Sequence, residues 1–172
     1  NYRCQGRENI TRTQKWVAHF QTVVKHILPR SAVALLRCGL HGWFTKHRFG
    51  ENSSCTMCGR YDDSVIHMIN CSAVRRLWRA LMGQWPFDGL ALLGFVDRDA
   101  TCAERIMLVC IMYGVFEFHR FWSHNTQQHT HGHARVPHAI IHFALGAPSQ
   151  HGDTHPQASL QRMRAVLITP IP

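Results

Sequence analysis

Acidic residues are scarce in this sequence, with 10 Asp and Glu against 19 Lys and Arg among 172 residues and a formal net charge of +9. The chain has no carboxylate cluster of the kind that nucleases use, no phosphate-binding Gly-rich loop and no nucleophile elbow. Spacing alone leaves a catalytic Cys–His pair open, but no such pair stands out. We therefore predict a protein that is not an enzyme and has no small-molecule substrate.

Long hydrophobic runs and a disulfide framework are also missing. The apolar stretch 106–118 is interrupted by Glu117 and is shorter than the ~20 residues that a helix needs to cross a bilayer, so we expect no membrane span. The number of Cys residues, seven, is odd, and their spacing does not suggest disulfides. Cys38, Cys102 and Cys110 lie in apolar runs and are expected to be core thiols in a reducing compartment.

The chain does contain one cluster with complete metal-ligand spacing. Cys55, Cys58, His67 and Cys71 form a C-x2-C-x8-H-x3-C pattern. Zinc takes four such donors at tetrahedral corners, and two Cys separated by two residues can both reach one ion from a tight turn. Because four protein ligands leave no open position, we predict one structural Zn2+. The alternative is a set of three buried thiols and a core histidine.

The residues between these ligands fit the metal prediction. Gly59 allows a tight turn in which backbone amides face the sulfurs, and Asp63-Ser64 is typical of a helix start. His67 and Cys71 are four residues apart, so on one helix they would share a face. We expect that face to point at the ion.

The positive charge is concentrated in the first half of the chain. Up to Arg79 there are 13 Lys and Arg against 4 acids, whereas the remainder holds 6 of each. Sixteen of the 19 cations are Arg, whose planar guanidinium suits phosphate and stacks on bases. This distribution favours a polyanion as the partner. The alternative is a solvated basic face that binds no ligand.

Helical periodicity predicts a mainly α fold, in which a small helical domain is organised around the zinc turn. The predicted helices are 11–28, 32–38, 73–82, a short helix within 85–94, and 101–124. Thr11 is expected to cap the first helix and Pro29 to end it, while Ser31 opens the second and Ser72 caps the third. In helix 73–82 the apolar residues face inward and three arginines face outward, namely Arg75, Arg76 and Arg79.

Composition divides the chain into three parts. A basic helical zinc-binding domain is expected at 1–83, a neutral helical segment packing on it at 84–124, and an extended tail with short helices at 125–172. The tail is rich in His, Gly and Pro, which is typical of segments that are poorly ordered alone. His129, His131 and His133 alternate within it and offer metal donors, but no closing ligand is specified, so we interpret them as incidental composition.

A longer pattern surrounds the Cys/His cluster. It consists of Leu35-Leu36-Arg37-Cys38-Gly39-Leu40, then Thr45, Arg48 and Phe49, the cluster itself, and Arg75-Arg76-Leu77-Trp78. This pattern covers about a quarter of the chain and resembles the zinc-binding region that lies C-terminal to the reverse transcriptase of non-LTR (LINE-type) retroelements.

The resemblance implies that the three Cys and the His are metal ligands, that flanking basic residues approach nucleic acid, and that the chain is a domesticated, non-catalytic derivative. The family commonly has four residues between the His and the last Cys. Here Met68-Ile69-Asn70 are three, which shortens the ligand helix.

The catalytic signature of a polymerase is not found. Tyr61-Asp62-Asp63 invites comparison with the Tyr-x-Asp-Asp signature of reverse transcriptases, but the aromatic residue is one place too close to the acids and no apolar strands flank it. We interpret Asp62 and Asp63 as turn and helix-cap residues.

Together these patterns predict a non-catalytic RNA-binding structural protein. Zinc fixes the turn, while cationic side chains contact phosphates and aromatic ones stack on exposed bases. The predicted contact residues are Trp43, Lys46, Arg48, Phe49, Arg60, Arg75, Arg76 and Arg79.

The expected setting is a large ribonucleoprotein, with RNA (rRNA favoured) and neighbouring proteins as partners. An organellar, mitochondrial ribosome is the assembly that we favour, while nuclear and cytoplasmic locations stay open. One alternative is a nucleic-acid-gripping fragment of an active non-LTR reverse transcriptase. A second is a protein-binding subunit of another complex that uses zinc only as a staple.

Overall fold

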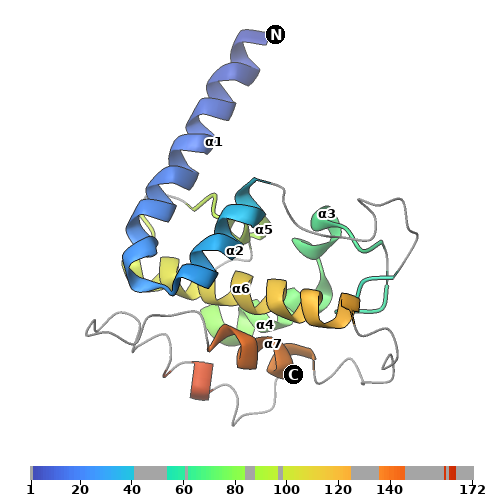
Figure 1. The fold of residues 1–172 in the computed structure, drawn as a ribbon. Helices are drawn as coiled ribbons and strands as arrows, with labels where there is room; N and C mark the ends of the chain where they lie inside the picture. Colours follow the sequence, from blue (N-terminus) through green and yellow to red (C-terminus); the bar gives the residue numbers. More distant parts are fainter. Residues whose placement is uncertain are drawn as a thin grey trace.

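The computed structural model describes residues 2–40, 54–60, 62–83, 88–96, 99–124, 136–145, 161 and 163–165, and within these ranges the chain forms helices and no β-strand (Figure 1). The mainly α prediction is therefore confirmed. The elements are α1 (Tyr2–Val23), the 3-10 turn η1 (Val24–His26), α2 (Pro29–Gly39), α3 (Val65–Met68), α4 (Ser72–Met82), α5 (Gly89–Leu92), α6 (Cys102–His124) and α7 (Val136–Ala144).

Helix α6 is the centre of the fold. It contacts α1, α2, α4, α5 and α7, and in Figure 1 it runs between α2 above and α4 and α7 below. Residues 105–116 are all buried, so this helix is covered on every side, unlike a surface helix with one apolar stripe. None of the described helices combines the length and apolar character needed to span a membrane.

The start of α6 follows local sequence rules. The side chain of Glu104 accepts a hydrogen bond from the backbone N–H of Thr101 at 2.7 Å, and the Thr101 hydroxyl accepts one from the N–H of Glu104 at 3.3 Å. This reciprocal pair is a capping box, which satisfies two N–H groups that have no partner inside the helix. The predicted helix 101–124 is confirmed to within one residue.

The first two helices do not begin where the sequence predicted. Helix α1 already starts at Tyr2, so Thr11 is an interior residue and not a cap. Its first turns project away from the other helices (Figure 1), and they form because extending an existing helix adds one hydrogen bond per residue even without core contacts. Helix α2 starts at Pro29, ahead of Ser31, because proline is well tolerated at the first helical position.

Trp16 joins three parts of the core. Its indole N–H donates a hydrogen bond to the carbonyl oxygen of Leu93 at 3.1 Å, and its ring stacks on Phe20 with centroids 5.4 Å apart. The ring also fits against two glycines, because a Cβ atom at Gly39 or Gly94 would lie only 2.3 Å or 2.8 Å from indole atoms. Helix α1 is thereby held against the end of α2 and the chain after α5.

Helix α7 belongs to the same hydrophobic core as the other helices. Ile140, Ile141 and Ala144 are fully buried, and Gly114 of α6 allows close contact, since a Cβ there would lie 2.4 Å from the carbonyl oxygen of Ile140. Of the predicted tail, only α7 with residue 145 and residues 161 and 163–165 are described. The alternating histidines at 129, 131 and 133 lie outside the described residues.

His19 is a buried polar residue in this core. Its side chain is 1% exposed, and burial, together with the charge of Arg105, lowers its pKa from 6.5 to about 3. Native protein therefore holds the imidazole neutral at pH values where an unfolded chain would protonate it.

We expect the free energy of unfolding to fall as the pH is lowered from about 6.5 toward 3. The stabilisation from neutral His19 is complete above the pKa of His19 in the unfolded chain. It is lost as the pH falls toward the pKa of His19 in the native protein, and the free energy of unfolding then changes by up to about 1.4 kcal/mol per pH unit. Urea unfolding at several pH values should show a shallower dependence for His19→Asn than for the unmodified protein. Loss of a metal in acid would affect both proteins equally, so it does not change the difference between them. Parallel curves of unfolding free energy against pH would contradict the assignment to His19.

Candidate metal centre

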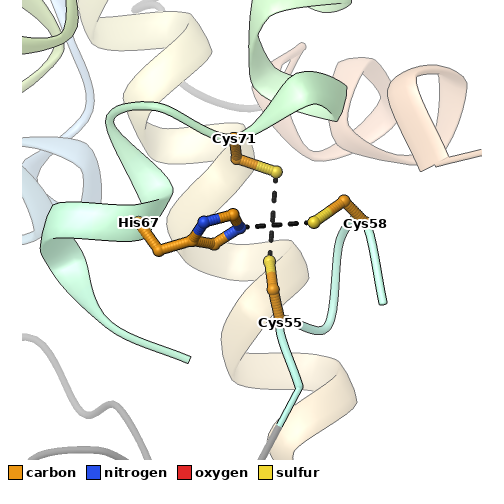
Figure 2. Close-up of side chains that lie close together, drawn as sticks. All are labelled: Cys55, Cys58, His67 and Cys71. Atoms are coloured by element: carbon orange, nitrogen blue, oxygen red, sulfur yellow. Dashed lines mark hydrogen bonds between the residues drawn. The ribbon is translucent and has the colours of Figure 1, made fainter. Parts of the chain in front are cut away.

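The fold brings the predicted ligands Cys55, Cys58, His67 and Cys71 to one point. Their donor atoms all lie within 4.8 Å of one another, and the three Cys residues are buried while His67 is half-buried (Figure 2). Cys55 and Cys58 come from the turn at 54–60, His67 comes from α3, and Cys71 directly precedes α4.

The turn that holds Cys55 and Cys58 depends on Gly59. This glycine has φ 69°, and its N–H donates to the carbonyl oxygen of Cys55 at 2.8 Å. The backbone N–H of Met57 points at the Cys55 sulfur at 3.4 Å. The prediction that Gly59 permits a turn with an amide facing a ligand sulfur is confirmed, because a left-handed φ is readily adopted only by glycine.

Helix α3 starts as predicted but ends early. The Ser64 hydroxyl accepts a hydrogen bond from the His67 N–H at 3.1 Å, which caps the helix. The helix ends at Met68, and Cys71 is the extended residue that precedes α4, with φ −60° and ψ 133°. The prediction that His67 and Cys71 share one helical face is therefore wrong.

The chain between His67 and Cys71 turns instead of continuing as a helix. The N–H of Asn70 donates to the carbonyl oxygen of His67 at 2.8 Å, and the N–H of Cys71 donates to that of Met68 at 3.2 Å. These tight hydrogen bonds replace the helical ones and redirect the chain, so that Cys71 reaches the site from the start of the next helix. Ser72, predicted as the cap of α4, is its first residue.

The donor geometry fits one tetrahedral ion. The sulfurs of Cys55 and Cys71 are 3.9 Å apart, and the sulfur of Cys58 lies 3.2 Å from Nε2 of His67. Two thiolates bound to one tetrahedral zinc are about 3.8 Å apart, given a Zn–S bond of about 2.3 Å. Four protein donors fill such an ion's positions, so the arrangement suits a structural metal and not a catalytic one.

The pKa values of the four donors are shifted by burial and by one hydrogen bond between two thiols. A hydrogen bond to Cys71 and burial raise the pKa of the Cys55 thiol, while the same hydrogen bond lowers the pKa of Cys71. Burial raises the pKa of Cys58 and lowers the pKa of His67, which keeps its imidazole neutral and able to donate a lone pair. A metal ion would replace the protons on the buried thiols and balance the charge of the thiolates.

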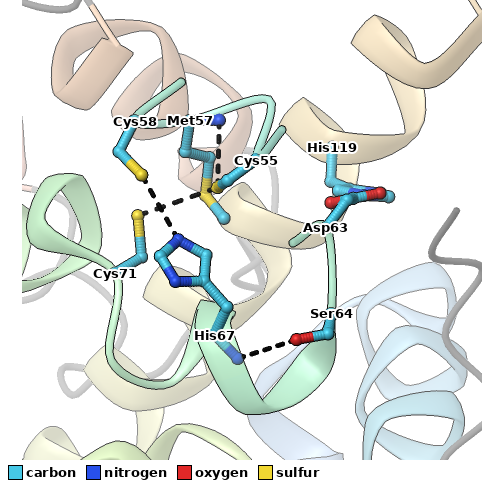
Figure 3. A network of polar contacts seen from close by, with 8 residues as sticks. All are labelled: Cys55, Met57, Cys58, Asp63, Ser64, His67, Cys71 and His119. Carbon is cyan, nitrogen blue, oxygen red and sulfur yellow. Dashed lines mark hydrogen bonds and ion pairs between the residues drawn. The ribbon is translucent and has the colours of Figure 1, made fainter. Parts of the chain in front are cut away.

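A buried hydrogen-bonded pair joins the segment before α3 to the central helix. Both carboxylate oxygens of Asp63 lie close to Nε2 of His119 in α6, at 2.8 and 2.9 Å, and both side chains are 4% exposed (Figure 3). Asp63 was predicted to be a turn or helix-cap residue, but the cap is Ser64 and Asp63 packs inward. Sequence reasoning missed the pair because 56 residues separate its members.

Four of the predicted nucleic-acid contacts gather beside the metal centre. A cleft of about 550 Å³, here called the arginine cleft, is lined by Cys58, Gly59, Ser72 and four arginines, namely Arg60, Arg75, Arg76 and Arg79. Arg76 is half-buried and the other three are exposed, which confirms the outward arginine face predicted for α4. The other predicted contacts, Trp43, Lys46, Arg48 and Phe49, lie outside the described residues.

Comparison with known proteins gives no relative. No family model, curated protein or solved structure matches the chain. The resemblance of residues 34–78 to the retroelement zinc region therefore stays a prediction.

We predict that the purified protein contains one equivalent of metal and that Cys71→Ser loses it. The free energy of unfolding of the variant should also be lower by several kcal/mol, because metal-binding energy contributes directly to folding. Elemental analysis and thermal unfolding measure the two effects. Cys102→Ser is the matched control, since this half-buried thiol lies outside the cluster. A metal-free, fully folded unmodified protein would contradict the prediction.

We expect Asp63→Asn to destabilise the fold by about 1–3 kcal/mol, the usual cost of leaving a buried hydrogen-bonding group without its partner. Asp99→Asn serves as the control, because Asp99 is exposed and lies outside the metal centre, so that its loss should change stability by no more than about 0.5 kcal/mol. Urea unfolding of both variants checks this, and equal stabilities would rule out a structural role for the Asp63–His119 pair.

Proposed function

We propose that this chain is a non-catalytic RNA-binding protein in which a structural zinc ion positions the arginine cleft for contact with phosphates. The observation that carries the proposal is the convergence of Arg60, Arg75, Arg76 and Arg79 on one cleft beside the Cys/His site.

Zinc is the metal that best suits the donor set. Three thiolates and one imidazole at tetrahedral positions are typical of structural zinc sites, whereas magnesium and calcium prefer oxygen donors in larger shells. The chemistry that zinc supplies here is cross-linking: it would tie the turn at 54–60 to α3 and to the start of α4.

The charge balance leaves the cleft cationic. A zinc ion with three thiolates and one neutral imidazole carries one net negative charge, while four arginines line the adjacent cleft. The metal site therefore offsets only part of their charge, and the cleft retains an attraction for anions. Arg75 also donates a hydrogen bond to Asn70 at 3.3 Å, which helps to orient its guanidinium.

The cleft is supported by a rigid helix. One face of α4 packs on the core, where four of its side chains are fully buried: Val74, Leu77, Trp78 and Leu81. This packing fixes the position of the helix, and the arginines lie on its opposite face. Arg75 and Arg79 are one turn apart and lie on the same side of the helix. Guanidinium groups bind phosphate oxygens in pairs of parallel hydrogen bonds, and a row of them suits a phosphodiester backbone better than a single small anion.

The setting that we favour is a large ribonucleoprotein such as an organellar ribosome. The strongly basic first half of the chain supports it, because phosphate neutralisation is the main sequence-independent contribution to RNA affinity. In that setting the protein would act through binding and positioning, with rRNA and neighbouring proteins as partners.

A second candidate function is the gripping of template or target nucleic acid within a non-LTR reverse transcriptase. It is favoured by one observation: the ligands that the resemblance implies, Cys55, Cys58, His67 and Cys71, lie together next to the arginine cleft. Preference for an RNA–DNA hybrid or duplex DNA over single-stranded RNA would support this candidate over the first.

We expect single-stranded RNA to bind with an affinity that falls as salt is raised from low to moderate concentration. Arg75→Gln/Arg79→Gln should weaken binding and reduce the slope of log K against log salt by about 1.4, since each phosphate contact on a single strand contributes about 0.7. Fluorescence anisotropy of a labelled RNA at several salt concentrations measures both quantities.

The charge-matched control is Arg12→Gln/Lys25→Gln, which removes two cations outside the cleft from α1 and η1. This control should bind RNA with a slope close to that of the unmodified protein. Binding that does not depend on salt, or equal losses in both double variants, would contradict the proposal.

A further inference from the structure

A second basic cleft lies on α2, α6 and α7 and shares no residue with the arginine cleft. We call it the α2–α6 cleft; its volume is about 570 Å³, within the range of ligand-binding pockets. The residues that matter for its chemistry are Arg30 and Arg37 of α2 and Tyr113, Phe116, Glu117 and Arg120 of α6.

Cations surround this cleft. Arg30, Arg37 and Arg120 are exposed, and His142 of α7 adds an exposed imidazole. Among the described residues that line it, the one carboxylate is Glu117, which accepts hydrogen bonds from Arg120 at 2.6 and 3.1 Å. The side chain of Arg37 forms no hydrogen bond or ion pair with another residue of the described part of the chain. The positive charge of the cleft is thus only partly neutralised by the protein itself.

Aromatic rings form the floor of the cleft. Tyr113 and Phe116 are 5% and 7% exposed, and the guanidinium carbon of Arg30 lies 6.0 Å from the centre of the Tyr113 ring. At this distance the guanidinium and the ring form a cation–π contact at the edge of the cleft. An apolar floor also lowers the local dielectric, which strengthens the attraction between the surrounding arginines and an anion.

The spacing of the arginines points to an extended polyanion. Arg30 and Arg37 are two helical turns apart, so their Cα atoms are separated by about 10 Å along the axis of α2. A single phosphate group is much smaller than this interval, whereas a phosphodiester backbone presents charges along it.

We propose that the α2–α6 cleft binds a second segment of RNA backbone, so that one molecule of this protein bridges two RNA segments. The inference rests on the proposed RNA-binding function and extends it to a second site. Helices α2 and α4 both pack on α6, so the two clefts are carried by one core and hold a fixed relation to each other. The protein would thereby fix the relative position of the two segments.

The test measures bridging separately from binding. The unmodified protein, confirmed as monomeric by sedimentation, is bound to a short immobilised single-stranded RNA and then offered a second, labelled RNA of unrelated sequence. We expect capture of the second RNA by the unmodified protein and by Arg12→Gln/Lys25→Gln. Arg30→Gln/Arg37→Gln should still bind the immobilised RNA but capture at least about tenfold less of the second, because it retains only the arginine cleft.

The outcomes separate this inference from the proposed function. If Arg30→Gln/Arg37→Gln captures the second RNA as well as the unmodified protein does, the α2–α6 cleft is not an RNA site. RNA binding by the arginine cleft is tested separately, with Arg75→Gln/Arg79→Gln. If the unmodified protein binds no RNA at all, both proposals fail. Arg37→Glu alone repeats the test if the double variant does not fold, because Arg37 is exposed and its loss removes no hydrogen bond or ion pair of the described structure.

Discussion

The burial of residues 105–116 of α6 on every side is the constraint on which the rest of this structure depends. A helix with twelve consecutive buried residues exposes no face to water, so other elements must cover its whole circumference. Helices α1, α2, α4, α5 and α7 do this, and the positions that they take around α6 determine where the polar features lie. The arginine cleft forms on the outside of α4, and the α2–α6 cleft forms where α2 and α7 approach the same central helix.

The metal centre depends on this packing as well as on its own ligands. The segment that leads into α3 is held to α6 by the Asp63–His119 pair, and α4, which follows Cys71, is held to α6 by apolar contacts. Two attachments of different physical character therefore meet at the site. The Asp63–His119 pair restrains α3, which carries His67, while hydrophobic burial restrains α4, which directly follows Cys71. A metal ion would join α3 and the start of α4 directly.

Features encoded by nearby residues could be predicted from the sequence, whereas features that depend on distant residues could not. The ligand set follows from spacing, the turn from Gly59, and the exposed arginines of α4 from helical periodicity. The break between α3 and α4 was missed, because the i,i+4 spacing of His67 and Cys71 fits a continuous helix and also fits a turn. The starts of α1 and α2 were placed too late. Thr11 can cap a helix or lie inside one, and Pro29 can end a helix or occupy its first position. Asp63 with His119, and the lining of the α2–α6 cleft, come from segments far apart in the chain, so no local pattern marks them.

The position of Cys71 at the residue before α4 has a consequence for the rotational phase of that helix. A ligand at this point fixes not only where the helix begins but also the direction in which each following side chain points. Each residue advances the helix by about 100°, so a single insertion between Cys71 and Ala73 would rotate every later position by that angle while the metal stayed in place. Arginines would then turn toward the core and leucines toward water. The metal ligand thus fixes the rotation of α4 about its axis. The number of residues between Cys71 and each later position determines whether that side chain faces the core or the solvent.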